Sequence, residues 1–483
     1  MKKFISLILL AVMLLSLCAC GAKPMVDEGG QTASEEKTFR VGYARYDITP
    51  TESVPLGGFG NTDKRLSTNI LRRLYVTCIA ITDEQDNTIL LYGCDFQQPN
   101  QTIMNVRPVI SQATGVPENQ IMINGSHTHA GPDMSQTGFE SIQRWIQLLH
   151  AQMVLAGQDA MESRKPATMY YGSVETEDLN FVKHYKYIDE NGDVKYFGDN
   201  FGTAVYNDTT EHTTVVDSTM FLMRFEREGE KDIVFASWRS HPLLDGGSSL
   251  TNVSSDYIGA FREAIELQLD CDFAFYQGAA GNNNCKTRLT KESRTTDTAE
   301  HGALLAGYAI EGLTNNMTKV DDPGLIQTRC TQLESEINHD TDSLVYAAKE
   351  VQAVWSATNV FAEAAAVGKP YGIRSPYMAN AINSRASKPA TWVSELDAFA
   401  IGDHVAIVSA PNELFDQLGE QTEAGSTYPM TVTLGYTNGY TGYIPTAYGF
   451  EHTSYETDVC WFKPGIGETM VDTFLTMLDD MDG

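Results

Sequence analysis

The sequence is poor in positive charge and in paired cysteines. Its 34 Lys and Arg face 63 Asp and Glu, which leaves a formal net charge of −29. Such an acidic surface repels nucleic acid and anionic lipid headgroups, so we expect neither as a direct ligand. The absence of any Cys-x-x-Cys pair argues against a zinc site built from thiolates. Because no internal repeat or linker-like stretch follows residue 37, we expect 38–483 to form one large domain.

A long apolar run occurs only at the N-terminus. Lys2 and Lys3 precede the apolar segment Phe4–Leu17, and small residues lead from it to Cys20. This pattern is typical of an export signal, and the apolar segment is too short for a stop-transfer helix. The exit Leu-x-Ala-Cys resembles a bacterial lipoprotein signal, which predicts cleavage before Cys20 and a lipid on its thiol. An ordinary signal cut near Ala19 is the alternative.

Residues 21–37 are polar and lack apolar periodicity, so they predict a flexible tether. The expected organisation is therefore a lipoprotein-type signal peptide at 1–20, a tether at 21–37 and a folded domain at 38–483. The protein would be exported and anchored by a lipid at Cys20 to the bacterial cell membrane, facing outside. Loss of the two signal lysines would take the net charge from −29 to −31.

Six cysteines remain beyond the signal and Cys20, and their spacing is irregular. Two of them lie inside apolar, strand-like runs, which favours a role as small buried hydrophobic residues. Disulfide bonds are the alternative in an exported chain. The six are Cys78, Cys94, Cys271, Cys285, Cys330 and Cys460.

Strand-like and helix-like segments alternate along the domain. The β-branched runs Tyr75–Thr82 and Thr88–Cys94 flank a polar turn and predict a β-hairpin. Helical periodicity marks Ser141–Ser163 and Asp256–Leu267, and the long stretch Pro323–Val367 is also predicted to be helical. This alternation predicts an α/β fold in which mixed β-sheets pack with helices in a single large domain.

Two of the ten histidines stand two residues apart, at the exit of a short apolar strand. His127 and His129 follow the run Gln120–Asn124 and precede a Gly-Pro break. In an extended segment, residues i and i+2 point to the same face, so both imidazoles would project into one space. That arrangement suits a metal ion and is unusual in a hydrophobic core.

Other chemically capable side chains also follow apolar β runs. They are His241, the Asn-rich loop from Asn282 to Asn284, Glu413 and Tyr443. Because strand ends gather at one edge of the sheet in α/β proteins, we expect a site at these strand ends. Asp95 ends the run Thr88–Cys94, and it fits a cap or turn residue as well as a residue that approaches the site.

Each of these residues taken alone also fits a structural role. His241 stands before a proline and could cap or pack, and Glu413 could be a first-turn helix acid that the helix dipole favours. Tyr443 could be a packing residue. The loop at Asn282–Asn284 could be a plain turn, or it could direct backbone N–H groups toward a ligand.

The motifs taken together resemble the catalytic domain of the neutral ceramidase family of zinc amidases. The resemblance covers about residues 39–475 and depends on the order of the motifs rather than on any single one. In chain order they are Gly42 with Asp47-Ile-Thr-Pro50, Ser126-His-Thr-His-Ala-Gly-Pro132, Val216-Asp217 with Leu222-Met-Arg-Phe225, Ser240-His-Pro242, Ser255-Asp-Tyr-Ile-Gly259, Gln277-Gly-Ala-Ala-Gly-Asn282, Ala410-Pro-Asn-Glu413, and Asn438-Gly-Tyr-Thr-Gly-Tyr443 with Tyr455-Glu456.

The resemblance implies a catalytic zinc site. The ligands of one Zn²⁺ per chain would be His127, His241, Glu413 and Tyr443. Two neutral imidazoles and a carboxylate leave an open position, as a catalytic zinc requires. His129 would stand beside the metal as general base and then acid, and Tyr455 would face the substrate and stabilise the oxyanion. The activity implied is hydrolysis of a linear amide C–N bond.

The sequence also departs from the ceramidase pattern. Where ceramidases carry Asp and then Ser-Pro, this chain has Asn282-Asn-Asn284 and Cys285, and a segment that brings an arginine toward the site is here Asn180-Phe-Val182. The substrate-loop candidates are Asp95, Asn282 and Asn284. Both ceramide and another amide, such as an N-acyl lipid or a cell-envelope compound, stay open as the substrate. Since the sequence runs only about 28 residues past Tyr455, we expect no counterpart of the C-terminal immunoglobulin-like domain of ceramidases.

Two other classes of protein compete with this interpretation. A metallophosphoesterase would have a similar late histidine pair, but Gly93-Cys-Asp-Phe96 lacks the early partner histidine that those enzymes need. A solute-binding surface lipoprotein, or an inactive relative of the ceramidases, would share the signal, the tether and the acidic α/β domain.

Overall fold

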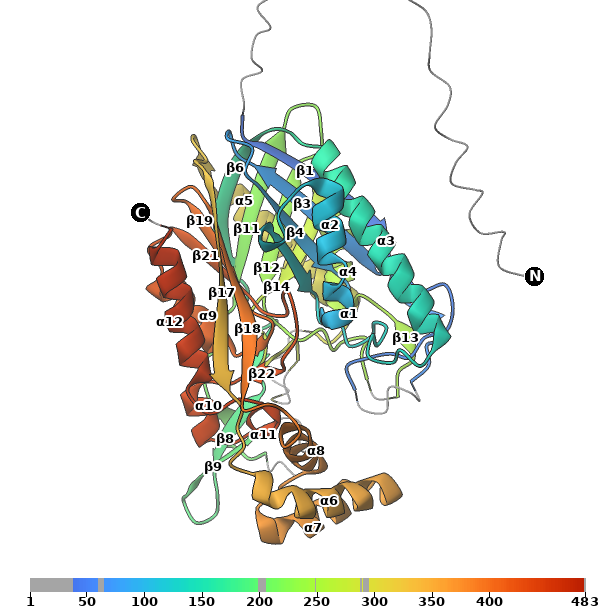
Figure 1. Ribbon diagram of the computed structural model, residues 1–483. Helices are drawn as coiled ribbons and strands as arrows, with labels where there is room; N and C mark the ends of the chain where they lie inside the picture. The colour runs from blue at the N-terminus through green and yellow to red at the C-terminus, as the bar shows by residue number, and fades with distance from the viewer. Residues whose placement is uncertain are drawn as a thin grey trace, which may run out of the picture. The chain divides into compact units, whose positions relative to one another are not determined.

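Two β-sheets packed face to face form the centre of the part of the domain that this computed structural model describes (Figure 1). The described residues are 38–59, 65–198, 206–247, 249–286, 289 and 295–481. The predicted signal at 1–20 and the predicted tether at 21–37 lie outside them. Lys37–Gly483 cluster as one compact unit.

The larger sheet has nine strands in the described residues and is mixed, because β4–β5 and β12–β14 are parallel pairs and β1–β3 and β3–β4 are antiparallel. In spatial order its strands are β14 (Asp272–Gln277), β12 (Ile233–Trp238), β11 (Thr219–Arg227), β6 (Lys165–Glu175), β1 (Arg40–Asp47), β3 (Tyr75–Thr82), β4 (Thr88–Cys94) and β5 (Ile121–Gly125), with β16 (Thr318–Val320) paired to β6.

The smaller sheet packs its inner face on the larger one. Its order is β17 (Ile326–Glu336), β18 (Thr391–Ile401), β19 (Val405–Ser409) and β21 (Met430–Leu434). One apolar cluster joins the two inner faces, for example Ile79 and Phe235 of the larger sheet with Phe399 and Val432 of the smaller. Burial of these side chains is the main stabilising contribution to the domain.

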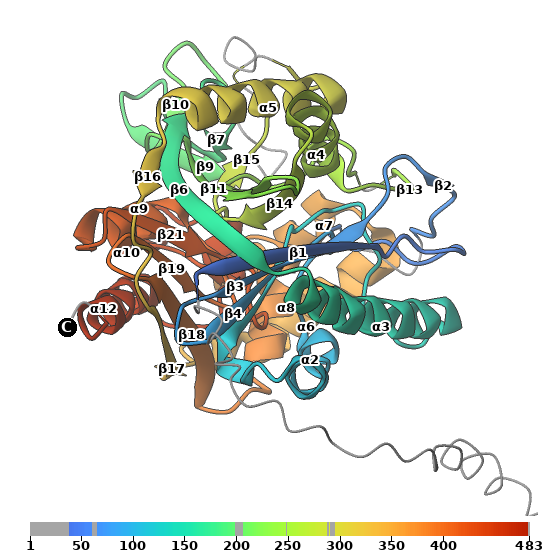
Figure 2. The same ribbon diagram turned by 90° about the horizontal axis from the view of Figure 1, so that it is seen from above.

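Helices cover the outer faces of both sheets, which gives a helix–sheet–sheet–helix arrangement (Figures 1 and 2). Separate apolar clusters join α2 and α3 to the β1–β3–β4–β5 half of the larger sheet, α4 and α5 to its other half, and α9 and α12 to the smaller sheet. The helices are α1 (Gln101–Met104), α2 (Arg107–Thr114), α3 (Glu140–Glu162), α4 (Asp256–Leu269), α5 (Thr298–Asn315), α6 (Val345–Thr358), α7 (Phe361–Gly368), α8 (Pro376–Arg385), α9 (Asp416–Gly425), α10 (Ala447–Glu451), α11 (Tyr455–Val459) and α12 (Ile466–Asp479).

Short strand pairs lie at the ends of the two sheets and position the site described below. The pairs β7 (Phe181–Val182) with β15 (Asn283–Asn284) and β20 (Glu413–Leu414) with β22 (Tyr443–Ile444) are the important ones. β2 (Asn69–Ile70) also pairs with β13 (Asn252–Val253), and β8 (His184–Ile188) lies between β9 (Val194–Gly198) and β10 (Glu211–His212) in a small three-stranded sheet. Short 3₁₀ turns occupy Glu118–Gln120, Asp342–Leu344 and Lys369–Tyr371.

The predicted hairpin and the α/β class are confirmed. Strands β3 and β4 have the predicted bounds, and the Asp83 carboxylate stabilises their turn by accepting from the backbone N–H groups of Gln85 at 2.8 Å and Asn87 at 2.9 Å. The long helix α3 lies within one residue of its prediction and buries an apolar stripe that includes Trp145 and Leu149.

The prediction of helix throughout Pro323–Val367 is wrong in its first part. Ile326–Glu336 is the edge strand β17, which pairs with β18 along its whole length. Its Gln, Leu and Glu residues favour a helix, but pairing across the sheet overrides that weak local preference. Helices begin only at Val345, where α6 starts.

All six cysteines of the described residues are free thiols, and five are buried as predicted; Cys330 is exposed.

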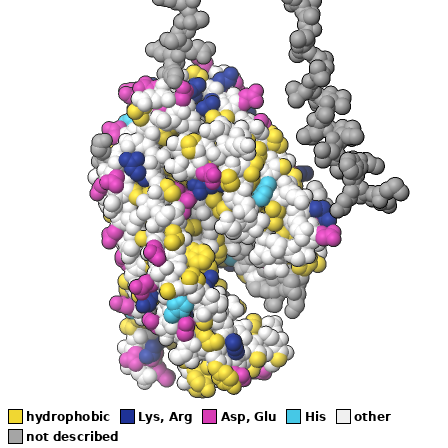
Figure 3. Space-filling model, viewed as in Figure 1, with side chains coloured by type: hydrophobic (Ala, Val, Ile, Leu, Met, Phe, Trp, Pro, Cys, Tyr) yellow, Lys and Arg dark blue, Asp and Glu magenta, His cyan; other side chains and the backbone are white. Residues whose placement is uncertain are grey.

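Figure 3 shows apolar side chains gathered on the visible surface at the end of the molecule where α6–α8 lie, and Tyr346, Val360 and Tyr371 are exposed in that segment. Among the described residues, no helix has the length and apolar character needed to cross a membrane.

Candidate metal centre

The chain turns sharply as it leaves β5, and this turn directs His127 and His129 inward. His127 has a φ of 65°, a value that is uncommon outside glycine. Its backbone N–H donates to the carbonyl of Phe96 at 3.0 Å, which joins it to the segment after β4. The extended geometry assumed from the sequence is therefore wrong at His127, although both imidazoles still reach one buried space.

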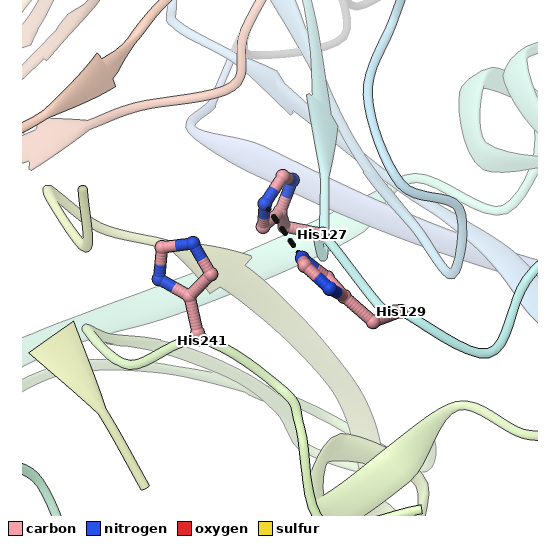
Figure 4. Close-up of side chains that lie close together, drawn as sticks. All are labelled: His127, His129 and His241. Atoms are coloured by element: carbon pink, nitrogen blue, oxygen red, sulfur yellow. Dashed lines mark hydrogen bonds between the residues drawn. The ribbon is translucent and has the colours of Figure 1, made fainter. Parts of the chain in front are cut away.

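His241 completes a group of three imidazoles (Figure 4). The ring centroid of His127 lies 4.8 Å from that of His129 and 4.9 Å from that of His241. Nε2 of His129 lies 3.1 Å from Nε2 of His127. All three side chains are buried, and each offers one nitrogen within 4.8 Å of the others, so the group could hold a metal ion.

Glu413 adds a carboxylate to this group. Its Oε2 lies 3.4 Å from Nε2 of His127 and 3.2 Å from Nε2 of His241. Glu413 stands on β20, and its direct partner on the parallel strand β22 is Tyr443. The Tyr443 ring stacks on that of His241 with centroids 6.4 Å apart. The four predicted metal ligands, His127, His241, Glu413 and Tyr443, thus lie next to one another.

Backbone carbonyls orient two of the imidazoles. Nδ1–H of His127 donates to the carbonyl of Gln97 at 2.9 Å, and Nδ1–H of His241 donates to the carbonyls of Ala280 at 2.8 Å and Asn283 at 2.9 Å. A carbonyl only accepts, so the proton is on Nδ1 and the Nε2 lone pair faces the shared space. This is the usual support for a metal-binding histidine. The Gly/Asn loop therefore contributes carbonyls here, rather than the N–H groups that the sequence suggested.

The distances between donor atoms fit a zinc ion. Tetrahedral ligands at the usual Zn–N and Zn–O lengths of about 2.0–2.1 Å stand about 3.3 Å from one another. The separations of 3.4 and 3.2 Å from Oε2 of Glu413 to Nε2 of His127 and of His241 are close to that value. Nε2 of His241 is buried and has no hydrogen-bond partner among the described residues, which leaves its lone pair available to a cation.

The protonation states also suit a cation. Burial lowers the pKa of His241 to about 4, and the Lys183 ammonium contributes to that fall. Burial and the neighbouring His127 and His241 lower the pKa of His129 well below its ordinary value. Burial opposes ionisation of Glu413, but His127 and His241 hold its pKa well below the ordinary range. At neutral pH His129 and His241 are neutral and Glu413 is charged.

Two tyrosines that were not among the predicted site residues contact the carboxylate of Glu413. The Tyr440 hydroxyl donates to Oε1, and the Tyr436 hydroxyl lies 3.4 Å from Oε2. The Tyr436 ring also covers His127, with centroids 4.3 Å apart. A signal for both was present, because Tyr436, Tyr440 and Tyr443 recur in one Gly-rich aromatic loop.

A glycine turn holds His129 from the other side. Gly58 has a φ of +94°, and a Cβ built there would lie 2.4 Å from Cγ of His129. The Phe59 ring meets the His129 ring edge-on, with centroids 5.1 Å apart. Arg65, itself buried, donates to the carbonyls of Gly57 at 2.8 Å and His129 at 3.1 Å. Only a glycine leaves room for the imidazole at this turn.

Tyr455 and a buried ion pair lie beside Tyr443. The Tyr455 ring meets the Tyr443 ring at 78° with centroids 5.8 Å apart. Lys183 follows the Asn180-Phe-Val182 segment, where no arginine occurs, and places its Nζ 5.2 Å from the centroid of the Tyr443 ring and 3.0 Å from Oε1 of Glu456. Lys183 was not predicted as a site residue, because nothing in its local sequence distinguishes it from a surface lysine.

The three substrate-loop candidates have structural partners. Both oxygens of Asp95 bind Arg262, at 2.9 and 3.0 Å, so this carboxylate joins the end of β4 to α4. Oδ1 of Asn282 accepts from the backbone N–H of Asp416 at the start of α9 at 2.8 Å. Asn284 forms a β-bridge with His241, which helps to place that imidazole.

Solved structures share this architecture. The crystal structure of neutral ceramidase from Pseudomonas aeruginosa matches with a TM-score of 0.67 and 16% sequence identity, over 93% of this chain and 75% of that one. A structure of ceramidase complexed with C2 matches with the same TM-score and identity, over 92% and 75%. The chain has the neutral ceramidase fold. No family model and no curated protein matches the sequence.

In this neutral ceramidase fold, the histidine and carboxylate group lies where strands of both sheets end. His127 follows β5, His241 follows β12, and Glu413 follows β19 after a short turn. Asn124 of β5 joins these strand ends, because its Nδ2 donates to the carbonyl of Gly435 at 2.8 Å and its Oδ1 accepts from the N–H of Gln277 at 2.8 Å.

Proposed function

We propose that this chain is a zinc-dependent amide hydrolase of the neutral ceramidase family. The observation that carries the proposal is the buried group of imidazole nitrogens and one carboxylate oxygen at zinc-like separations, in a fold shared with neutral ceramidase. A fold alone can host many activities, so the donor group is the decisive part. The proposed ligands of one zinc ion are His127, His241, Glu413 and Tyr443.

The proposed chemistry divides between the ion and two side chains. Bound zinc would polarise the scissile carbonyl and lower the pKa of a bound water toward about 7. His129, kept neutral by burial, accepts the proton of the attacking water and returns it to the leaving amine. Burial raises the pKa of Tyr455, so its hydroxyl stays protonated and can donate to the carbonyl oxygen as negative charge develops there.

The proposed substrate is an N-acyl compound with a linear amide bond, such as an N-acyl lipid or a cell-envelope component. The structural neighbours are named as ceramidases. The Asn282–Asn284 loop differs from the ceramidase motif, so for this chain we propose the reaction class and leave ceramide as one substrate to be tried.

We also propose that the protein is exported and held at the outer side of a bacterial membrane by a lipid on Cys20. The N-terminal sequence supports this location. Replacement of Cys20 by Ala should release the protein from the membrane fraction into the medium or periplasm. Retention of the variant on membranes would contradict the lipid anchor.

Metal analysis combined with an amidase screen tests the enzyme proposal. We expect one zinc per folded chain, release of fatty acid from N-acyl amides, and loss of that release on chelation with recovery on adding zinc. A folded, zinc-free protein would overturn the proposal. Two metals per chain with cleavage of phosphate esters would favour a metallophosphoesterase, and zinc without turnover on any amide would favour an inactive binding protein.

A further inference from the structure

Strand pairing delivers a buried lysine to the edge of the metal centre. Lys183 lies between β7 and β8, and its backbone N–H donates to the carbonyl of Asn282 at 2.8 Å. β7 pairs with β15, the strand whose Asn283 carbonyl orients His241. The Lys183 side chain is 4% exposed, and its Nζ lies 5.2 Å from the ring centroid of Tyr443.

The Lys183 ammonium has more N–H groups than its ion pair with Glu456 requires. The Lys183 ammonium forms an ion pair with Oε1 of Glu456 at 3.0 Å, and His184 donates to Oε2 at 2.7 Å, so His184 also helps to hold this carboxylate. An ammonium has three N–H groups, and Glu456 takes one of them. By contrast, the guanidinium of Arg65, near His129, is occupied by the backbone carbonyls of Leu56, Gly57, His129 and Leu250.

Burying an ammonium is unfavourable unless its charge and its donors are used. Because Glu456 offsets part of the charge, the remaining field favours a singly charged group over a doubly charged phosphate. A row of aromatic rings continues from Tyr443 through Tyr455: the Tyr455 ring lies 5.5 Å from that of Tyr377, and the Tyr377 ring lies 6.3 Å from that of Phe361. These rings suit an apolar acyl chain, which leaves the charged group to the amine portion of the substrate.

We propose that Lys183 binds a carboxylate on the amine portion of the substrate, so that the preferred substrates are N-acyl amino acids. This inference rests on the proposed amide hydrolase activity. In such a substrate the carboxylate is attached to the carbon next to the amide nitrogen. The Tyr443 ring is a neighbour of both the Lys183 ammonium and the His241 ring. The ammonium therefore lies at the edge of the proposed metal centre, where the amide would be hydrolysed.

A matched pair of substrates tests this assignment. N-dodecanoylglycine and N-dodecanoylethanolamine share the acyl chain and the amide and differ in carrying a carboxylate or a hydroxyl. We expect the native protein to prefer the glycine conjugate by about tenfold or more in kcat/KM, since hydrogen bonds to charged groups are the stronger ones. Lys183→Met should lose this preference mainly through KM, whereas Lys183→Arg should keep part of it.

A neighbouring lysine supplies the control. Lys186 is on β8 and pairs with Glu211 at 3.1 Å on a partly exposed surface, so Lys186→Met should leave the preference unchanged. The double variant Lys183→Met/Glu456→Gln removes both charges of the pair and tests the preference if Lys183→Met alone does not fold. Equal kcat/KM for the two conjugates, or a preference that survives in Lys183→Met, would overturn the role of Lys183.

Calorimetric binding of the same two ligands needs no turnover and separates this inference from the proposed function. Tighter binding of the glycine conjugate without hydrolysis of either would support Lys183 and contradict the amidase proposal. Hydrolysis of both conjugates without any preference would support the amidase proposal and contradict the role of Lys183. Failure to bind either conjugate would overturn the assignment of Lys183.

Discussion

At the residue scale, the important feature is the direction in which each imidazole presents its free nitrogen. Carbonyls bind Nδ1–H of His127 and His241, which turns Nε2 of both toward Glu413. His129 has no such support, because its Nδ1 lacks a hydrogen-bond partner among the described residues. An imidazole without that support is better suited to carrying a proton than to holding an ion.

Replacing His129 by Ala should therefore reduce turnover sharply and leave bound zinc near one per chain. A general acid–base residue contributes roughly 10²–10⁴-fold, so the loss of kcat should be of that order. Zinc content and kcat measured on the same preparation check this. His404→Ala, at the surface, is the control and should keep both, while loss of zinc in His129→Ala would make His129 a ligand.

Tyr440→Phe should weaken metal binding without removing a ligand. The Tyr440 hydroxyl donates to Oε1 of Glu413, and losing such a supporting partner typically lowers metal affinity roughly 10–100-fold. Competition with a chelator measures the change. Tyr448→Phe, whose ring is exposed in the same part of the chain, should bind zinc as the native protein does; equal affinities in the two variants would contradict the role of Tyr440.

At the element scale, the site depends on loops that leave the strands in tight turns. The turn after β5 requires a positive φ at His127, and the turn at Gly58 approaches the His129 ring. Such turns keep side chains from distant loops in contact with one another. They also make the site sensitive to substitutions that leave the sheets intact.

Gly58→Ala should reduce turnover sharply. The added Cβ meets the His129 ring, and a displacement of about 1 Å of a catalytic group can cost roughly 10²-fold in rate. Gly465 has the same φ of +94° but no atom within 4 Å of an added Cβ. Gly465→Ala therefore carries the same backbone strain, about 1–2 kcal/mol, and should keep its activity. Similar kcat values in the two variants would rule out the contact with His129.

At the scale of the whole molecule, buried acids link stability to pH. Burial raises the pKa of Asp256, Asp397 and Glu420 to about 7. Between about pH 4 and pH 7 the folded protein holds protons that the unfolded chain has released, so stability falls as pH rises through that window. The net charge of −29 adds self-repulsion in the same direction.

These buried acids should thus destabilise the metal-free protein at pH 8 relative to pH 5, while the lowered pKa values of His129 and His241 act in the opposite direction up to about pH 6.5. Asp397→Asn should reduce this loss by at least about 1 kcal/mol, because the amide has no charge to bury at the higher pH. Denaturant unfolding at both pH values, in the presence of a chelator, measures it. The exposed Asp403→Asn is the control. The same change in stability from pH 5 to pH 8 in Asp397→Asn and in the native protein would contradict the assignment.

Much of the fold followed from local patterns. The β3–β4 hairpin and α3 were predictable because alternation and helical periodicity are visible within a few residues of one another. β17 was not, since its residues favour a helix and only pairing with β18 makes a strand of them. Strand ends likewise indicated His127, His241 and Glu413 as one group, because sheets bring their ends together.

The sequence by itself determined most of the secondary-structure pattern, the acidic charge and the order in which the candidate ligands occur. Tertiary structure alone decided which atoms meet: the carbonyls on His241, the hydroxyl of Tyr440 on Glu413, the turn at Gly58 against His129, and Lys183 beside Tyr443. The physical reason is that these contacts join residues far apart in the chain. Their geometry depends on how two sheets pack, and no local pattern encodes that packing.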